Sequence, residues 1–130
     1  MTPDELSERL RRFAARVGKL VDALPETRLG RHVAGQLVRC GISAPPNYDE
    51  GCAAESRPDF IHKLGIALKE VKETRGWLRF IIIAALLAEK RIAPLLRECE
   101  ELSNIIAQSL LTARSRGPAR RTGKPSNASI

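Results

Sequence analysis

Residues 47–87 have the sequence NYDEGCAAESRPDFIHKLGIALKEVKETRGWLRFIIIAALL, and this stretch decides the fold. Its polar first part ends in a strong helix start, made by Ser56, Pro58 and Asp59. Serine caps helices, proline suits the first helical turn, and an acid there interacts favourably with the helix dipole. The sequence therefore predicts a helix from Ser56 to about Ala88.

Apolar residues recur on two sides of this helix. The main stripe, at spacings of three and four residues, predicts contact with the core of the chain. Its members are Phe60, Leu64, Ala67, Val71, Thr74, Leu78, Ile82 and Ala85. The opposite stripe begins charged and ends apolar, and comprises Asp59, Lys63, Ile66, Glu70, Glu73, Trp77, Phe80 and Ala84.

From Trp77 to Ala88 the only polar side chain is that of Arg79. One bundle of four helices cannot cover apolar residues around a whole helix, so either another subunit covers them or a large apolar patch is exposed. We expect a homo-oligomer, because the first arrangement removes that patch from water. The predicted subunit interface comprises Ile66, Trp77, Phe80 and Ala84.

Helices are also predicted before this stretch. The first runs from about Pro3 to Leu24, with Thr2 and Glu5 forming a capping box. The second starts near Glu26 and carries two prolines, Pro45 and Pro46. Proline removes a backbone donor and clashes with the preceding turn, so a kink or break is expected near residues 43–47.

The last predicted helix follows a turn at residues 89–91, opens at Pro94 and runs to about Arg114. Four helices with short connections predict an all-α protein, an antiparallel up-down-up-down four-helix bundle. The bundle domain is expected at residues 1–114. Residues 115–130 are rich in Arg, Ser, Gly and Pro and almost lack apolar residues, so a disordered basic C-terminal tail is expected there.

The positive charge of the chain is concentrated at this end. The chain has a net charge of +7, but residues 1–113 hold 17 basic and 15 acidic residues. The cations beyond them are Arg114, Arg116, Arg120, Arg121 and Lys124, with no acid among them. Such a tail either improves solubility or contacts RNA or another polyanion.

A second group of cations lies in the first helix, on the face opposite its apolar stripe. Arg11, Arg12 and Lys19 are the members of this face that could contact nucleic acid. Nearby acids offset most of their charge, which makes a solvated helix surface the favoured interpretation and an RNA-binding face the alternative.

The residues that usually carry catalysis or bind metals do not form a pattern here. His32 and His62 lack the upstream glutamate of a Glu-x-x-His motif, and the sequence contains no GxSxG, P-loop or GxGxxG. Cys40 lies on an apolar face, so a core position is favoured over a nucleophile. We therefore expect no enzyme activity, no metal, no cofactor and no small-molecule substrate.

Cysteine usage and hydropathy bear on localisation. Cys40, Cys52 and Cys99 are an odd number without a CxxC motif, which suits a reducing cytosol. Arginines interrupt any signal-peptide core at the N-terminus, and the longest apolar run, Phe80–Ala88, is shorter than the about 20 residues of a membrane span. The sequence predicts a cytoplasmic protein that does not enter the membrane.

One polar constellation remains after the core and the tail are assigned. It comprises Arg39, Ser43, Asn47, Glu50, Lys63, Glu70 and Glu73. Backbone groups that the prolines leave unpaired need partners, and polar residues often fix the register of an assembly. A hydrogen-bonded network that braces the bundle is therefore the favoured interpretation, and a ligand or RNA pocket is the alternative.

These polar positions belong to a longer pattern, which spans roughly residues 20–113. Its most specific members are Asn47, Tyr48, Glu50, Ala54, Glu55, Ser56, Asp59, Phe60, Lys63, Leu64, Ala67, Leu68, Lys69, Glu70, Glu73, Trp77 and Leu78. In this pattern the chain resembles the four-helix bundle family named after proteins encoded in intervening sequences of 23S ribosomal RNA genes. Pro45-Pro46 and Gly51-Cys52 depart from that family's usual helical residues.

The resemblance implies a left-handed four-helix bundle that assembles into a homopentamer and has no known catalytic activity. A relative in the same structural group, the accessory protein of diversity-generating retroelements, is a basic pentamer that binds nucleic acid and a reverse transcriptase. We therefore expect an oligomeric binding or scaffold protein that contacts RNA or a nucleoprotein partner. The alternative is a purely structural assembly without a nucleic acid role.

Overall fold

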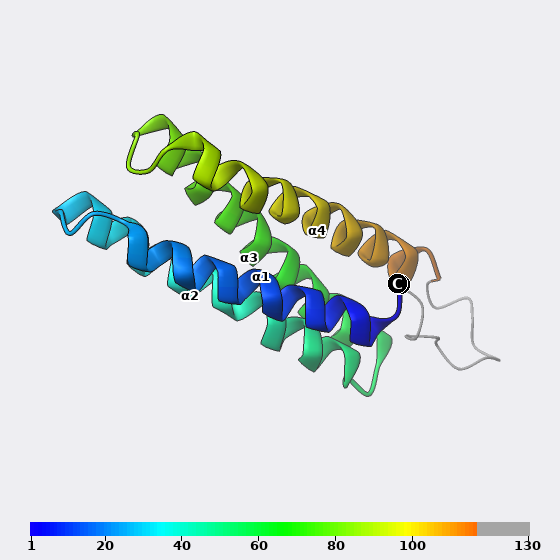
Figure 1. Cartoon of the computed structure of the whole chain (residues 1–130). Helices are drawn as coiled ribbons and strands as arrows, with labels where there is room; N and C mark the ends of the chain where they lie inside the picture. Colours follow the sequence, from blue (N-terminus) through cyan, green and yellow to red (C-terminus); the bar gives the residue numbers. More distant parts are fainter. Residues whose placement is uncertain (117–130) are drawn as a thin grey trace.

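The computed structural model describes residues 1–116, which form four α-helices. They are α1 (Pro3–Ala23), α2 (Arg28–Cys52), α3 (Arg57–Ile83) and α4 (Glu89–Arg116). Successive helices run in opposite directions, as the colours from blue α1 to orange α4 show (Figure 1). The predicted all-α antiparallel four-helix bundle is confirmed. Nearly all of the predicted tail lies outside the described residues.

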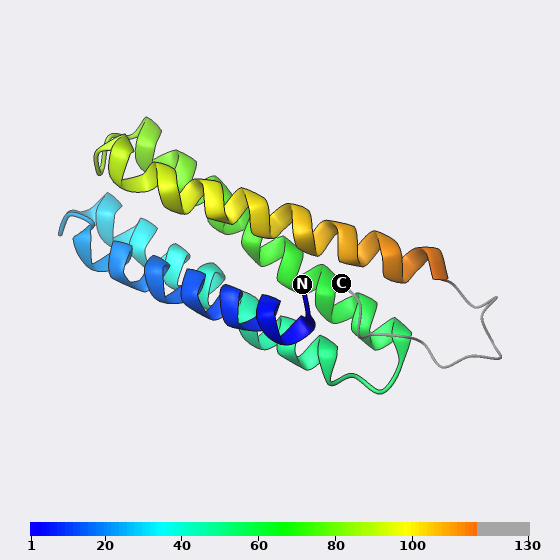
Figure 2. The same ribbon diagram turned by 45° about the vertical axis from the view of Figure 1, so that its right-hand side comes forward.

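Each helix packs against two of the other three. α1 meets α2 and α4, and α3 meets the same two helices, so that the chain visits the corners of the bundle in sequence (Figure 2). The α2–α3 seam is the most extensive and the α1–α4 seam the sparsest. The largest fully buried side chains are Tyr48, Phe13, Leu6, Leu10, Leu37, Leu64, Leu78, Ile81, Ile92, Leu102, Ile106 and Val17.

Polar caps set where three of the helices begin. Thr2 accepts a hydrogen bond from the Glu5 amide while the Glu5 side chain accepts one from the Thr2 amide, so the predicted capping box is confirmed. Ser56 caps α3 as predicted. The start of α2 falls two residues later than expected, because Thr27 caps it by accepting a hydrogen bond from the Gly30 amide.

The break that the two prolines predict is wrong: residues 28–52 form one helix. Pro45 and Pro46 cannot donate to the carbonyls of Gly41 and Ile42, which lose their helical partners. Pro46 and Ile42 face solvent, where water can solvate the freed carbonyl. Side chains support the backbone beside them, since the Asn47 amide donates to the Ser43 carbonyl at 2.9 Å.

Gly41 has a packing role in this helix. A Cβ atom at Gly41 would lie 2.7 Å from Cγ1 of Val17 on α1, closer than real atoms approach. The missing side chain therefore lets α1 and α2 come together where Val17 is fully buried. Gly41 costs helix propensity, but the interhelical contact that it permits compensates.

The predicted end of α3 at Ala88 is wrong by five residues. The helix ends at Ile83, and Ala85 adopts a left-handed conformation with φ of 55°. The Leu86 amide donates to the Ile81 carbonyl at 3.0 Å, and the Ala85 amide donates to the Ile82 carbonyl at 3.1 Å. These two bonds are those of a Schellman motif, which is usually built on glycine.

This early turn also moves the start of α4. The helix begins at Glu89, so the predicted turn at residues 89–91 and the predicted start at Pro94 are wrong. Leu86 and Leu87 lie in the turn and pack half-buried against the core. Part of the apolar run is therefore a turn that folds back onto its own chain, because its leucines gain more by burial there than by extending the helix.

Ion pairs between side chains, as well as apolar contacts, join α1 to α4. Nε of Arg9 lies 2.8 Å from Oε2 of Glu98, and Nη2 of Arg9 lies 2.8 Å from Oε1 of Glu101. The hydrogen bonds from Arg9 hold the pKa of the Glu98 carboxyl below its usual value, against an opposing effect of burial. Within the part of the chain that the structure describes, no helix is long and apolar enough to cross a membrane.

Replacing Ala85 by glycine should stabilise the protein. The left-handed conformation costs an L-residue with a Cβ atom about 1 kcal/mol, so Ala85→Gly should raise the free energy of unfolding by about 0.5–1 kcal/mol. Denaturant unfolding followed by circular dichroism measures this. The matched control is Ala84→Gly, whose φ of −80° suits alanine, and it should lower stability. Equal effects of the two substitutions on stability would contradict the left-handed conformation of Ala85.

The Arg9–Glu98 pair should make stability depend on acid pH. Because the pKa of Glu98 is lowered by folding, its contribution is present above the unfolded-state pKa of about 4.3 and is lost as the pH falls through the folded-state pKa. Glu98→Gln should therefore cost about 1 kcal/mol at neutral pH, and the difference from wild type should vanish below that pKa. Unfolding curves across the acid range measure this, with exposed Glu26→Gln as the control.

Candidate functional site

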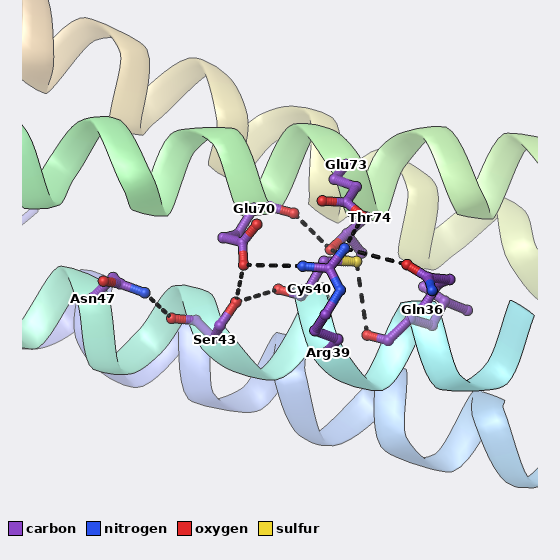
Figure 3. Close-up of polar contacts among 9 residues, drawn as sticks. Gln36, Arg39, Cys40, Ser43, Asn47, Glu70, Glu73 and Thr74 are labelled. Atoms are coloured by element: carbon purple, nitrogen blue, oxygen red, sulfur yellow. Dashed lines mark hydrogen bonds and ion pairs between the residues drawn. The ribbon is translucent and has the colours of Figure 1, made fainter.

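The predicted polar constellation lies on the seam between α2 and α3, and the structure brings four of its seven residues into one network (Figure 3). The Ser43 hydroxyl donates to Oε2 of Glu70 at 2.5 Å, and Arg39 lies 3.7 Å from the same carboxylate. Arg39 also donates to Glu73. Two carboxylates of α3 are thus held by one guanidinium and one hydroxyl of α2.

The other three residues are outside this set of side-chain contacts, although Asn47 is bonded to the main chain of Ser43. Nζ of Lys63 lies 2.7 Å from Oε1 of Glu50, forming a separate ion pair near the turn between α2 and α3. Asn47 bonds within its own helix to the Ser43 carbonyl. The constellation is therefore a row of polar contacts along one seam, with its densest part at Ser43 and Glu70.

Two residues that the sequence did not assign to the network lie beneath it. The Thr74 hydroxyl is fully buried and donates to the Glu70 carbonyl at 2.8 Å, and it lies 3.2 Å from Sγ of Cys40. Burial raises the pKa of the Cys40 thiol. A thiol that stays protonated is a poor nucleophile, so the core position that the sequence favoured fits this geometry.

The polar groups of this seam pair with one another across α2 and α3. The Glu70 side chain is only 13% exposed, and its carboxylate already accepts from a hydroxyl and lies beside a guanidinium. Every buried side-chain nitrogen or oxygen atom within residues 1–116 has a hydrogen-bond partner. Because these polar groups satisfy one another, the geometry supports the bracing interpretation over a ligand pocket.

The cationic face predicted on α1 is largely occupied by contacts within the chain. Nη1 of Arg11 donates to the Ser7 hydroxyl at 2.8 Å and lies 3.1 Å from Oδ2 of Asp49 on α2. Arg11 and Arg12 both pair with Glu8. The partner Asp49 lies 38 positions along the chain, so no local signal could identify it.

The remaining candidate cations lie at different places. Lys19 is exposed, and none of the ion pairs found in the described chain includes it. Arg114 is exposed near the end of α4, and Arg116 is the half-buried last residue of that helix. Arg120, Arg121 and Lys124 lie outside the described residues.

The four predicted interface residues, Ile66, Trp77, Phe80 and Ala84, are all half-buried in the single chain. Trp77 makes an edge-to-face contact with His32 of α2, with ring centroids 5.9 Å apart, and another with Phe80 at 5.6 Å. The adjacent Ile83 is 83% exposed. The chain shields part of this stripe and leaves the rest open.

A search of residues 1–116 for groups of histidine, cysteine and acidic side chains that could hold a metal ion finds none. The cysteines of the described chain are free: Cys40 and Cys99 are buried, and Cys52 is half-buried. Burial raises the pKa of Cys99 to about 12, and its thiol lies 3.3 Å from the Val71 carbonyl.

Comparison with known proteins places this geometry in a family. The family model described as 23S rRNA-intervening sequence protein matches residues 5–108. A crystal structure of a protein of unknown function from the S23 ribosomal protein family of Bacteroides thetaiotaomicron is 28% identical in sequence, with a TM-score of 0.76. That match covers 81% of this chain and 97% of the other. No curated protein sequence matches.

If the α2–α3 seam is a brace, Ser43 and Glu70 should be energetically coupled. A double-mutant cycle of Ser43→Ala and Glu70→Ala should give a coupling energy of about 1.5–3 kcal/mol, because the hydrogen bond is to a shielded charge. Denaturant unfolding of the four proteins measures it.

A matched cycle on the exposed Arg79–Glu100 pair, 3.0 Å apart, serves as the control and should give about 0.2–1 kcal/mol. A coupling at Ser43 and Glu70 no larger than that of the exposed pair would show that the seam does not brace the bundle.

Proposed function

Because the chain belongs to the 23S rRNA-intervening sequence protein family, we propose that it is a non-enzymatic, homo-oligomeric binding scaffold that contacts RNA. Copies of the bundle associate through the apolar end of the opposite stripe of α3, around Trp77, Phe80 and Ala84. The cations at the end of α4 and in the sequence beyond it, Arg114 to Lys124, contact RNA phosphates. Resemblance to the family suggests a pentamer.

The observation that carries this proposal is the partly uncovered apolar stripe of α3. Trp77, Phe80 and Ala84 stay half-buried although the helices of the chain have already packed, and Ile83 beside them is almost fully exposed. Leaving these side chains in water loses about 25 cal/mol for each Å² that a partner could cover. A neighbouring copy of the chain can cover it with a different surface, since a closed ring such as a pentamer is built from heterologous contacts.

The distribution of charge supports the RNA contact. Acidic residues stop at Glu101, while five cations follow from Arg114 onward. Phosphates neutralised by these cations would release counterions, so binding should weaken steeply with salt. Trp77 and Phe80 pack on each other, which leaves few aromatic rings for base stacking and favours contact with the backbone over reading of sequence.

A second candidate function is a purely structural assembly without RNA. The observation that favours it is the pairing of Arg11 and Arg12 with carboxylates, which offsets the charge of two of the three cations on the predicted α1 face. Both candidates require the oligomer, and only the first requires salt-dependent RNA affinity. The sedimentation experiment below tests the oligomer that both require, and the RNA-binding experiment separates the two candidates.

Charge placed in the stripe should dissociate the assembly. Wild type should sediment well above the 14.3 kDa of one chain, and Trp77→Glu should sediment as a monomer because desolvating the new carboxylate opposes association. Leu111→Glu, which adds the same charge at an exposed apolar residue of α4, is the control and should keep the wild-type mass. Circular dichroism verifies folding, and equal masses for wild type and Trp77→Glu would contradict the proposed interface.

Removing the residues after Arg116 should weaken RNA binding. Truncation to residues 1–116 keeps all four helices and removes three cations, so the slope of log affinity against log salt should fall by about 2 for single-stranded RNA. Fluorescence anisotropy over about 50–200 mM salt measures it. Unchanged affinity of the truncated protein would show that the tail does not contact RNA. Absence of RNA binding by wild type would favour the second candidate, the purely structural assembly.

A further inference from the structure

We propose that the hollow between the first half of α3 and the end of α4 binds the phosphate backbone of RNA; this rests on the proposed function and locates it on the folded body. Two adjoining cavities, with volumes of about 640 and 360 Å³, form the hollow. They share Gly65, Lys69 and Arg114. His62 lines the first cavity and Lys72 the second.

The sequence builds this hollow from one face of α3. His62, Gly65, Lys69 and Lys72 are spaced by three, four and three residues, so they lie on one side of the helix over three turns. A Cβ atom at Gly65 would meet nothing within 4 Å, so the helix surface is open between the charged side chains. Arg114 reaches the same space from α4.

The positive charge of the hollow is not neutralised by neighbouring carboxylates. The acids of α3 that follow Asp59 are Glu70 and Glu73, and both are tied to Arg39 on the α2 side. None of the ion pairs in the described chain includes Lys69, Lys72 or Arg114.

The three acids of α4 nearest to Arg114 in the sequence also pair with cations outside the hollow. Glu98 and Glu101 pair with Arg9 on α1, and Glu100 pairs with Arg79. No acid follows Glu101 in the sequence up to Arg116. Asp59, which follows the lining residue Pro58, is exposed and does not line either cavity. The charged side chains of lysine and arginine that line the hollow therefore have no acidic side chain among them.

The shape and the lining favour a phosphate chain as the occupant. Lys69 and Lys72 are about 4.5 Å apart along the helix axis, so they can reach neighbouring oxygens of one extended polyanion. Apolar side chains also line the cavities, Ile61 the first and Leu68 the second, and they can pack against ribose.

Lys69→Gln/Lys72→Gln in the full chain tests this proposal. The probe is a short, fluorescein-labelled, single-stranded RNA of mixed sequence. The double variant should bind it at least about five-fold more weakly near 100 mM salt, with a salt slope lower by about 1.4. The control Lys90→Gln/Arg91→Gln removes the same charge from exposed residues at the other end of α4 and should change affinity less than about two-fold.

The outcomes are distinguishable. Equal weakening by both double variants would show that net charge alone matters, and no weakening by either would place RNA elsewhere; both overturn the proposal. Absence of RNA binding by wild type would instead defeat the proposed function on which it rests. Displacement of the RNA by inorganic polyphosphate supports a phosphate site, whereas equally effective displacement by polyglutamate would overturn that assignment in favour of an acidic protein partner.

Discussion

A nearly buried carboxylate must find partners before two helices can close over it, and the α2–α3 seam depends on this constraint. Glu70 is satisfied by the Ser43 hydroxyl and by Arg39 of the facing helix. The apolar layer beneath can then close, with Thr74 and Cys40 fully buried directly below the carboxylate. Specific polar contacts thus fix the register of α2 against α3, while apolar burial supplies most of the stabilisation.

The same contacts divide the charges of α3 between its two sides. Glu70 and Glu73 pair with Arg39 of α2, whereas Lys69 and Lys72 lie on the side near α4, where they line a cavity with Arg114 and no acid. α3, with six basic and three acidic residues, therefore has an acidic side turned to α2 and a basic side turned to solvent. Net charge counted along the sequence hides this separation, which bears on any anionic partner.

Tertiary packing outweighs some of the local sequence signals for where a helix ends. Pro45 and Pro46 would end an isolated helix, but burial of Ala44 and Tyr48 on either side holds the chain helical through them. The apolar run after Trp77 predicts more helix than forms, because Ala85 can adopt a left-handed turn that returns Leu86 and Leu87 to the core. Neither outcome follows from propensity, since each depends on contacts with distant residues.

The sequence by itself determined the fold class, the capped starts at Thr2 and Ser56, and the placing of Glu70 and Glu73 on one side of α3. It could do so because periodicity, capping and turn chemistry are local. Only the tertiary structure decided that Arg11 pairs with Asp49 across two helices, that Glu70 is shielded, and that Lys69, Lys72 and Arg114 line one hollow. Those juxtapositions depend on how the helices are rotated and spaced, which packing sets and no short segment encodes.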